Sequence, residues 1–337
     1  MKIGKLRHRL YQKFFRRIEP HPAPSAQTVR EFKEAAWQSP EAASRYFETV
    51  SRISPGMQTE LDAALRFARG RILDVGAGTG RFSSALVRAE HPVTAIDLSA
   101  DMLRLASANE PALDCARASA FALPFADEQF DTVVSFWLLL HFHEWPQILS
   151  EMLRVAKPQA RIIFEMQNAS NLEQACRITG DDGLVPKKPN EFQTFASFEE
   201  VQSMAARAGA SVLWSRRYDL FSDNLVARAT LRERYDGWMN EIRDAFDNEG
   251  CCRFWIRFEE EHLSRLPQYM ARKIIFVLGK ENPEQDYQQT IKGDESHHRL
   301  IASNEAVARS INLFLEAFAS VCPDLSDLFE PQCIKTL

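Results

Sequence analysis

A short apolar run followed by a glycine-rich turn constrains the fold of this chain more than any other feature. Residues 71–75 (Arg-Ile-Leu-Asp-Val) are typical of a buried strand. Gly76, Gly78 and Gly80 come directly after it. Glycine can take positive φ and lets a ligand approach the backbone closely. Because a helix is predicted next, over residues 82–87, the segment predicts a strand–turn–helix unit whose turn contacts a ligand.

Strand-like and helix-like patterns alternate along the following two hundred residues. Strands are predicted over residues 92–96, 130–135, 161–165, 211–214 and 273–278, and helices over residues 99–105, 147–155 and 198–208. Strands separated by helices pair in parallel through right-handed crossovers. The sequence therefore predicts an α/β fold with a doubly wound, mostly parallel sheet.

Segments on either side of this pattern divide the chain into four parts. Residues 1–20 predict a basic amphipathic helix, and residues 21–60 a helical cover that precedes the sheet domain. Residues 61–280 hold the sheet, with a charged and aromatic helical insert at 216–271. Residues 281–337 form a C-terminal helical extension. We expect the insert and the extension to cover the core, with a lid or an oligomer surface as the alternative.

Charge is spread unevenly along the chain. Residues 1–30 hold eight Lys or Arg and one Glu, in a chain whose net charge is −5. The rest of the chain is therefore acidic, which argues against an enzyme that grips nucleic-acid phosphates over a broad face. In residues 1–18 the apolar and basic residues fall in neighbouring arcs of a helical wheel. Such a segment binds an anionic membrane surface or another acidic partner, or packs on the protein's own acidic body.

Three features of the sequence bear on the cellular compartment of the protein. Six cysteines without Cys-x-x-Cys or metal-like spacing are typical of reduced thiols in a cytosolic protein. The first residues lack the continuous apolar core of a secretory signal. The longest apolar run, residues 133–140, is too short to span a bilayer. We expect a cytoplasmic protein that can lie peripherally at the inner face of the membrane through residues 1–18.

Two carboxylates mark the ends of the first two predicted strands. Asp97 ends the second strand, where a carboxylate can take both hydroxyls of a ribose. Asp74 ends the first strand, where it repels a pyrophosphate and suits an ammonium group. A dinucleotide fingerprint would also need glycine at position 81, which is Arg81 here. The pattern predicts a nucleoside that carries an amino acid and disfavours a nicotinamide-dependent oxidoreductase.

These features resemble the class I S-adenosylmethionine (SAM)-dependent methyltransferases, of the type that includes quinone and other small-molecule methyltransferases. The resemblance covers about residues 42–280 and rests on four segments in the family's order, at residues 72–80, 95–103, 122–131 and 153–158. It implies a seven-stranded Rossmann-like sheet and SAM as the cofactor.

The resemblance also implies roles for matching residues. The methionine part of SAM is expected against Asp74, Gly76 and Gly78, with Gly80 also at the cofactor and Tyr46 of the helical cover closing over it. The remaining matches are Asp97 at the ribose, Leu98 and Met102 beside the adenine, Ser119, Ala120 and Phe121 at the adenine amino end, and Ser135 and Phe136 at the transfer site. Ser119 stands where the family often has Asp, which puts that contact in doubt.

Methyl transfer is an in-line displacement that depends largely on proximity and orientation. A base is needed only when the acceptor is an unionised hydroxyl or a carbon acid. His141 is the candidate base, with His143 and Glu144 as neighbours. Glu165 follows another strand, where it could orient a polar acceptor. The two histidines lack a third nearby ligand, so we expect no metal.

The sequence thus predicts a methyltransferase that acts on oxygen or carbon of a small or lipid-linked acceptor. The fourth predicted strand lacks the Asn/Asp-Pro-Pro-Tyr/Phe sequence that methyltransferases of nucleobases and glutamine often carry. Two alternatives stay open: an enzyme of a soluble metabolite without membrane contact, and a non-catalytic assembly partner that keeps the fold. The acceptor and the oligomeric state are also open.

Overall fold

The computed structural model describes residues 24–50, 54–180, 192–222, 224–280 and 305–329. The amphipathic segment predicted at the N-terminus lies outside this part. Among the described residues, no helix has the length and apolar character needed to cross a membrane. The five cysteines that the structure describes are free thiols.

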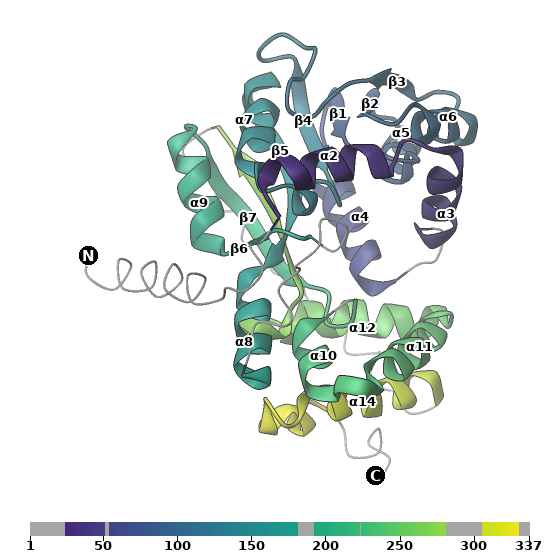
Figure 1. The fold of residues 1–337 in the computed structure, drawn as a ribbon, viewed down its shortest axis with the longest axis vertical. Helices are drawn as coiled ribbons and strands as arrows, with labels where there is room; N and C mark the ends of the chain where they lie inside the picture. Colours follow the sequence, from purple (N-terminus) through teal and green to yellow (C-terminus); the bar gives the residue numbers. More distant parts are fainter. Residues whose placement is uncertain (1–23, 51–53, 181–191, 223, 281–304, 330–337) are drawn as a thin grey trace.

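The centre of the fold is a mixed, mostly parallel eight-stranded sheet in the order β3-β2-β1-β4-β5-β8-β7, with β6 beside β5 (Figure 1). Its strands are β1 (Ile72–Val75), β2 (Val93–Asp97), β3 (Asp114–Arg117), β4 (Phe130–Ser135), β5 (Ala156–Asn168), β6 (Phe195–Ala196), β7 (Ser211–Tyr218) and β8 (Lys273–Gly279). Only β8 pairs antiparallel, with β5 on one side and β7 on the other. The doubly wound fold is confirmed.

The predicted strand count was one too low. A two-residue strand, β6, adds to the end of β5 through the pairs Gln167–Phe195 and Asn168–Ala196. So short a strand shows no periodicity in the sequence, and the pairing depends on the approach of two distant segments.

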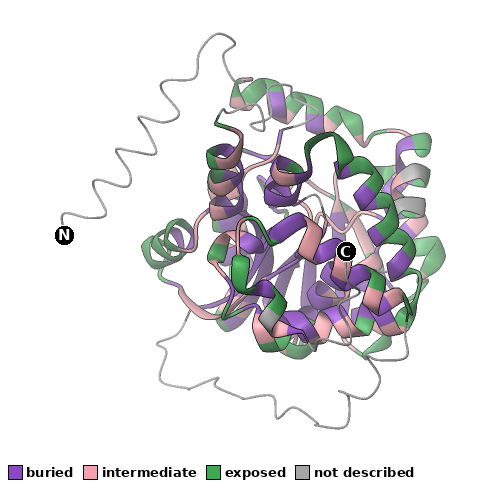
Figure 2. Cartoon of the chain, turned by 90° about the horizontal axis from the view of Figure 1, so that it is seen from below, coloured by how far each residue is buried: buried purple, intermediate pink, exposed green. Residues whose placement is uncertain are grey.

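Helices lie on both faces of the sheet and below it in the view of Figure 1. They are α2 (Ala26–Ala36), α3 (Pro40–Val50), α4 (Pro55–Phe67), α5 (Arg81–Arg88), α6 (Ala100–Asn109), α7 (Trp145–Val155), α8 (Ala169–Thr179), α9 (Phe198–Arg207), α10 (Leu225–Leu231), α11 (Tyr235–Phe246), α12 (Glu249–His262) and α14 (Glu305–Phe318). One apolar cluster joins α4 and α5 to one face, and another joins α7 and α9 to the opposite face. Figure 2 shows buried residues along the sheet and the inward sides of these helices.

A second core lies in the helices below the sheet in Figure 1. Helices α8, α10, α11, α12 and α14 surround an aromatic cluster that includes Phe221, Trp255, Phe258 and Phe314. The insert and the described part of the C-terminal extension therefore pack against each other. The insert starts after Tyr218, because Arg216–Tyr218 complete β7.

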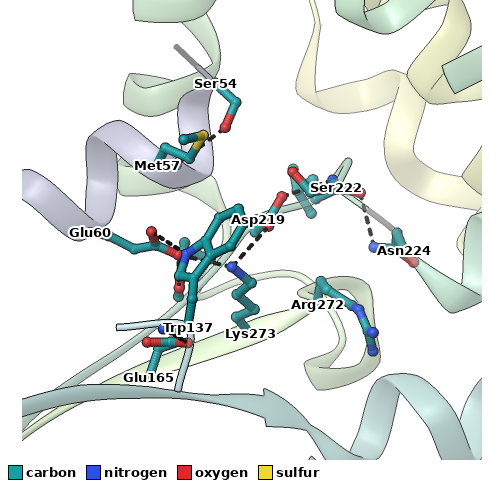
Figure 3. Close-up of polar contacts among 12 residues, drawn as sticks. Ser54, Met57, Glu60, Trp137, Glu165, Asp219, Ser222, Asn224, Arg272 and Lys273 are labelled. Carbon is teal, nitrogen blue, oxygen red and sulfur yellow. Dashed lines mark hydrogen bonds and ion pairs between the residues drawn. The ribbon is translucent and has the colours of Figure 1, made fainter. Parts of the chain in front are cut away.

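A buried polar cluster fastens α4 to the sheet (Figure 3). Glu60 of α4 accepts hydrogen bonds from Lys273 Nζ at 2.9 Å and from the Tyr218 hydroxyl at 2.6 Å through one carboxylate oxygen. The other oxygen accepts from Trp137 Nε1 at 2.8 Å. Glu60 is 0% exposed, and removal of one partner of such a pair would leave a buried charge uncompensated.

Glu165 lies beside this cluster, on β5. One carboxylate oxygen accepts a hydrogen bond from the Trp137 backbone N–H at 2.7 Å. The other is buried and has no hydrogen-bond partner within the described residues. Burial raises the pKa of Glu165 to about 8, and the charge of Glu60 adds to this effect. Glu165 is therefore largely protonated at neutral pH.

We expect Phe314→Ala to destabilise the protein by about 3–5 kcal/mol, because it leaves a cavity in the aromatic core. Phe314 is 0% exposed, and its ring centroid lies 5.0 Å from those of Trp255 and Phe318. Urea unfolding measures the change, and Phe32→Ala, at a residue 44% exposed on α2, is the matched control. Equal effects of the two substitutions would show that α14 is not part of the core.

We expect Glu165→Gln to remove one source of pH-dependent stability. The ordinary pKa of the carboxyl is 4.5 and its folded-state pKa is about 8, so folding favours the protonated form. This stabilisation is full below pH 4.5 and is lost as the pH rises through 8. The melting temperature of the wild type should therefore fall more between pH 5 and pH 8 than that of the variant.

The control for this experiment is Glu199→Gln, at an exposed residue of α9. Its melting curve should follow the wild type at every pH. Parallel pH profiles of wild type and Glu165→Gln would contradict the assigned protonation state.

Candidate functional site

A cavity opens at the carboxyl edge of the sheet, where β1, β2 and β4 end beneath α2 and α3. Ten of the thirteen predicted cofactor residues line it: Tyr46, Gly76, Gly78, Asp97, Leu98, Met102, Ser119, Ala120, Phe121 and Phe136. Asp74 lines a smaller neighbouring cavity, which shares Tyr46, Gly76 and Phe136 with the first. The site lies where the strand order reverses between β1 and β4, the usual ligand position in open α/β sheets.

Two predicted cofactor residues line neither cavity. Ser135 is 0% exposed, and its hydroxyl donates to the Val75 carbonyl at 2.9 Å, so it ties β4 to β1. Gly80 is the N-cap of α5 with a φ of 80°. A Cβ added there would lie 2.8 Å from the Cβ of Ala106, so Gly80 allows α5 and α6 to pack closely.

The glycine turn forms one wall of the cavity. Gly76 has a φ of 73°, and an added Cβ would lie 2.9 Å from the side chain of Leu138. The positive φ and the lack of room for a Cβ therefore both require glycine at this position.

Asp97 lines the larger cavity at the place where the sequence predicts the ribose. Its two carboxylate oxygens accept hydrogen bonds from the backbone N–H groups of Gly78, at 2.9 Å, and Ser99, at 2.8 Å. These contacts fix the carboxylate toward the cavity and leave further lone pairs for ligand hydroxyls. Burial raises the pKa of Asp97, and the two N–H groups oppose that rise.

Asp74 and Arg81 face the smaller cavity together. Asp74 is 2% exposed and accepts a hydrogen bond from the Ser83 hydroxyl at 2.5 Å. Burial raises its pKa to about 7, so an ammonium group at this place would favour the charged carboxylate. Arg81 supplies a cation in the same cavity. A carboxylate and a guanidinium that line one cavity match the two charges of an amino acid.

Arg81 was missed as a site residue by the sequence reasoning, which used it only against a dinucleotide fingerprint. The signal was its position as the first residue of α5, directly after the third glycine. A cation there lies at the same strand end as Asp74, where the amino-acid part of the ligand was expected.

The cover over the cavity comes from α2 and α3. The rings of Trp37 and Tyr46 meet edge to face, with centroids 5.5 Å apart. Lys33 of α2 and Trp37, the C-cap of that helix, both line the larger cavity, and neither was predicted. Arg30 of the same helix places its guanidinium 3.8 Å from the ring centroid of Phe121. Ser119 uses its hydroxyl to accept a hydrogen bond from the Phe121 N–H at 3.3 Å.

His141 lines the larger cavity from the 3-10 helix η1 (Leu139–His141). Its ring centroid lies 6.3 Å from that of Trp37, and its Nδ1 is buried without a hydrogen-bond partner among the described residues. Burial lowers the pKa of His141 to about 3, with a smaller contribution from the charge of Lys33. The imidazole is therefore neutral at physiological pH.

The other catalytic candidate, Glu165, lines neither cavity. It contacts the site through Trp137, which lines both cavities. Trp137 has a φ of 62°, an uncommon conformation for a bulky residue. Its indole nitrogen is held by Glu60, and Lys273 Nζ lies 4.4 Å from its ring centroid.

Two further residues near the site make structural contacts. His143 packs against Phe192, with ring centroids 3.9 Å apart. Asn168 caps α8 and donates to the carbonyls of Gln268 and Ala271. Within the residues that the structure describes, no group of three His, Cys, Asp or Glu side chains could hold a metal ion.

Comparison with known proteins agrees with this geometry. Residues 73–164 match a family model described as a methyltransferase domain. A demethylmenaquinone methyltransferase of Renibacterium salmoninarum is 35% identical over 39% of this chain and 57% of its own length. A ubiquinone biosynthesis O-methyltransferase of Methylococcus capsulatus is 30% identical over 45% of this chain and 66% of its own length. The chain thus spans less than two thirds of the length of each of these relatives.

Among solved structures, the magnesium protoporphyrin IX methyltransferase of Synechocystis PCC 6803 is 14% identical with a TM-score of 0.44, over 67% of this chain and 84% of that one. Residues 73–164 therefore carry a methyltransferase domain, and the chain is similar over that region to the quinone methyltransferases named above.

Proposed function

We propose that the chain is an enzyme that transfers the methyl group of SAM to an oxygen or carbon of a small or lipid-linked acceptor. The observation that carries the proposal is the pair of adjoining cavities. Asp97 at one side suits a ribose, and Asp74 with Arg81 at the other suits the charges of an amino acid. SAM is a nucleoside that carries an amino acid, and a molecule of its length would extend from one cavity into the other.

The cofactor, when bound, supplies an electrophilic methyl group on a sulfonium. The residues of this chain then bind, orient and exclude water. Tyr46, Phe136 and Trp137 line both cavities, so their rings surround the region between the two ends of the ligand. Aromatic faces attract a sulfonium cation and keep water away from it. Catalysis would then depend mainly on the orientation of the acceptor against the methyl group.

We propose His141 as the general base when the substrate that receives the methyl group binds in its protonated form. Its neutral imidazole lines the larger cavity, and its buried Nδ1 has no hydrogen-bond partner among the described residues. Its lowered pKa makes it a weak base, so it would serve acidic hydroxyls best. Glu165 acts as a positioning residue in this proposal, because its contact with the site runs through Trp137.

Two observations support the proposed class of acceptor. Relatives are named for demethylmenaquinone and ubiquinone biosynthesis, and both names denote lipid-linked rings. The sequence of residues 1–18 is basic and amphipathic, which suits an anionic membrane surface at the inner face of a cytoplasmic membrane. A soluble metabolite is the second candidate, in which those residues make no membrane contact. The assembled cofactor site argues against a non-catalytic assembly partner.

We expect Asp97→Ala to weaken the binding of S-adenosylhomocysteine at least about tenfold, because it removes hydrogen bonds between a charged group and the ribose. Isothermal titration of wild type and variant with SAM and S-adenosylhomocysteine measures the loss. Asp97→Asn keeps one acceptor oxygen and should bind with intermediate affinity. Asp62→Ala, at an exposed carboxylate of α4, should leave the affinity unchanged. Equal affinity in wild type and Asp97→Ala, or no binding by the wild type, would contradict the proposal.

We expect the full chain to float with vesicles that contain phosphatidylglycerol. A chain without residues 1–20 should remain in the bottom fraction of the gradient. Attraction between the basic segment and an anionic surface provides the binding, so neutral vesicles and high salt should abolish it. The truncated chain should still bind S-adenosylhomocysteine, which controls for folding. Failure of the full chain to float with anionic vesicles would exclude the membrane version and leave the soluble acceptor.

A further inference from the structure

A buried ion pair lies against the indole of Trp137. Glu60 and Lys273 are 0% and 6% exposed, and their charged groups are 2.9 Å apart. The described lining of both cavities includes Trp137 but neither member of the pair. We propose that this ion pair, acting through the ring of Trp137, sets the preference of the site for the sulfonium of SAM over the neutral thioether of S-adenosylhomocysteine. The inference rests on the proposed function and adds Glu60 and Lys273 to it as positioning residues.

The contacts of Trp137 hold its ring against the pair (Figure 3). Trp137 Nε1 donates to one oxygen of Glu60 at 2.8 Å, and the Trp137 backbone N–H donates to Glu165 at 2.7 Å. Lys273 Nζ lies over the ring, 4.4 Å from its centroid, and 2.9 Å from the second oxygen of Glu60. The indole therefore cannot turn away from the cavities without breaking these contacts.

Both members of the pair are charged. Glu60 accepts hydrogen bonds from an indole, a phenol and an ammonium group, which is the pattern of an ionised carboxylate. Burial lowers the pKa of Lys273, but the neighbouring carboxylates, led by Glu60, outweigh this effect and raise it. Asp219 Oδ2 lies 4.0 Å from the ammonium and adds a weaker attraction. Glu60 is thus the main group that offsets the charge of Lys273.

This charge balance matters for a cation in the cavities. A cation on an aromatic ring weakens the attraction of that ring for a second cation, because the two charges repel each other. Glu60 offsets the charge of Lys273, and its bond to the indole N–H places a negative charge at the ring edge. The ring therefore stays attractive to a sulfonium. S-adenosylhomocysteine lacks that charge, so the site favours the cofactor over the product and product release becomes easier.

The test compares the affinities for SAM and for S-adenosylhomocysteine, measured by isothermal titration of the full chain. The two ligands differ by one methyl group and its positive charge, so the ratio of their affinities reports the electrostatics at the sulfur. Glu60→Gln leaves the charge of Lys273 largely uncompensated. We expect this variant to lose about tenfold more affinity for SAM than for S-adenosylhomocysteine, the order of effect that one nearby charge has inside a protein.

Two further variants keep the test decisive. The Glu165 carboxyl is coupled to the charges of Glu60 and Lys273, so it could ionise in place of Glu60. Glu60→Gln is therefore also measured in a Glu165→Gln background, where this compensation cannot occur. Lys273→Met removes the repelling cation and should shift the ratio in favour of SAM. This opposite shift tests the inference even if Glu60→Gln does not fold.

Glu259→Gln is the matched control. Glu259 is a buried carboxylate of α12 that accepts hydrogen bonds from the N–H groups of Asp219 and Leu220, at 3.1 and 2.9 Å. Its replacement should lower the melting temperature, as that of Glu60 does, and leave the ratio of affinities at the wild-type value.

A merely structural role of Glu60 would weaken the binding of both ligands equally. Equal losses in Glu60→Gln in both backgrounds, or an unchanged ratio in Lys273→Met, would therefore overturn the inference. Failure of the wild type to bind either ligand would instead count against the proposed function.

Discussion

The parallel pairing of β1 with both β2 and β4 determines where the strand-end groups of the candidate cofactor site lie. In this register Asp74 is opposite Ala95 and Val134, so the three strands end at one edge. The Ile96 carbonyl then accepts hydrogen bonds from the N–H groups of Gly76 and Ala77, each at 2.9 Å. A shift of one residue would turn the side chain of Asp74 to the other face of the sheet. The glycine turn, the two carboxylates and the start of α5 all depend on this register.

A second constraint joins the site to the rest of the molecule. Glu60 on α4 is bonded to Lys273 at the start of β8, and Lys273 Nζ lies 4.0 Å from Asp219 Oδ2. Glu259 of α12 accepts hydrogen bonds from the N–H groups of Asp219 and Leu220. Contacts therefore run without a gap from the helical core below the sheet to Trp137 in the cavity wall. The antiparallel strand β8 is what brings these distant segments together.

Local patterns were enough to predict the groups that lie at strand ends. Asp74, Asp97 and the glycines could be placed because each follows an apolar run, and parallel strands end at a common edge. The roles of Ser135 and Glu165 could not be read in this way. Their side chains meet Val75 and Trp137, 60 and 28 residues away in sequence, and those contacts form only when the sheet is complete.

The cover was harder to predict for a different reason. Lys33 and Trp37 lie on an amphipathic helix whose sequence fits any surface helix, and only its docking above the sheet turns them toward the cavity. The aromatic core of the helical part likewise combines residues of α12 and α14, which about fifty residues separate in sequence. The sequence predicted that these segments are helical. It could not predict which faces would meet.

The backbone of Trp137 has a consequence for attempts to engineer this protein. A tryptophan with a φ of 62° is held in place by contacts of its side chain against the preference of its main chain. Replacement by glycine would relieve the main chain, but it would leave one oxygen of the buried Glu60 without its hydrogen bond and remove the ring beside Lys273. The same change would delete the indole that both cavities share. The side chain thus serves both the fold and the cavity, and thermostable variants of the chain should be sought elsewhere.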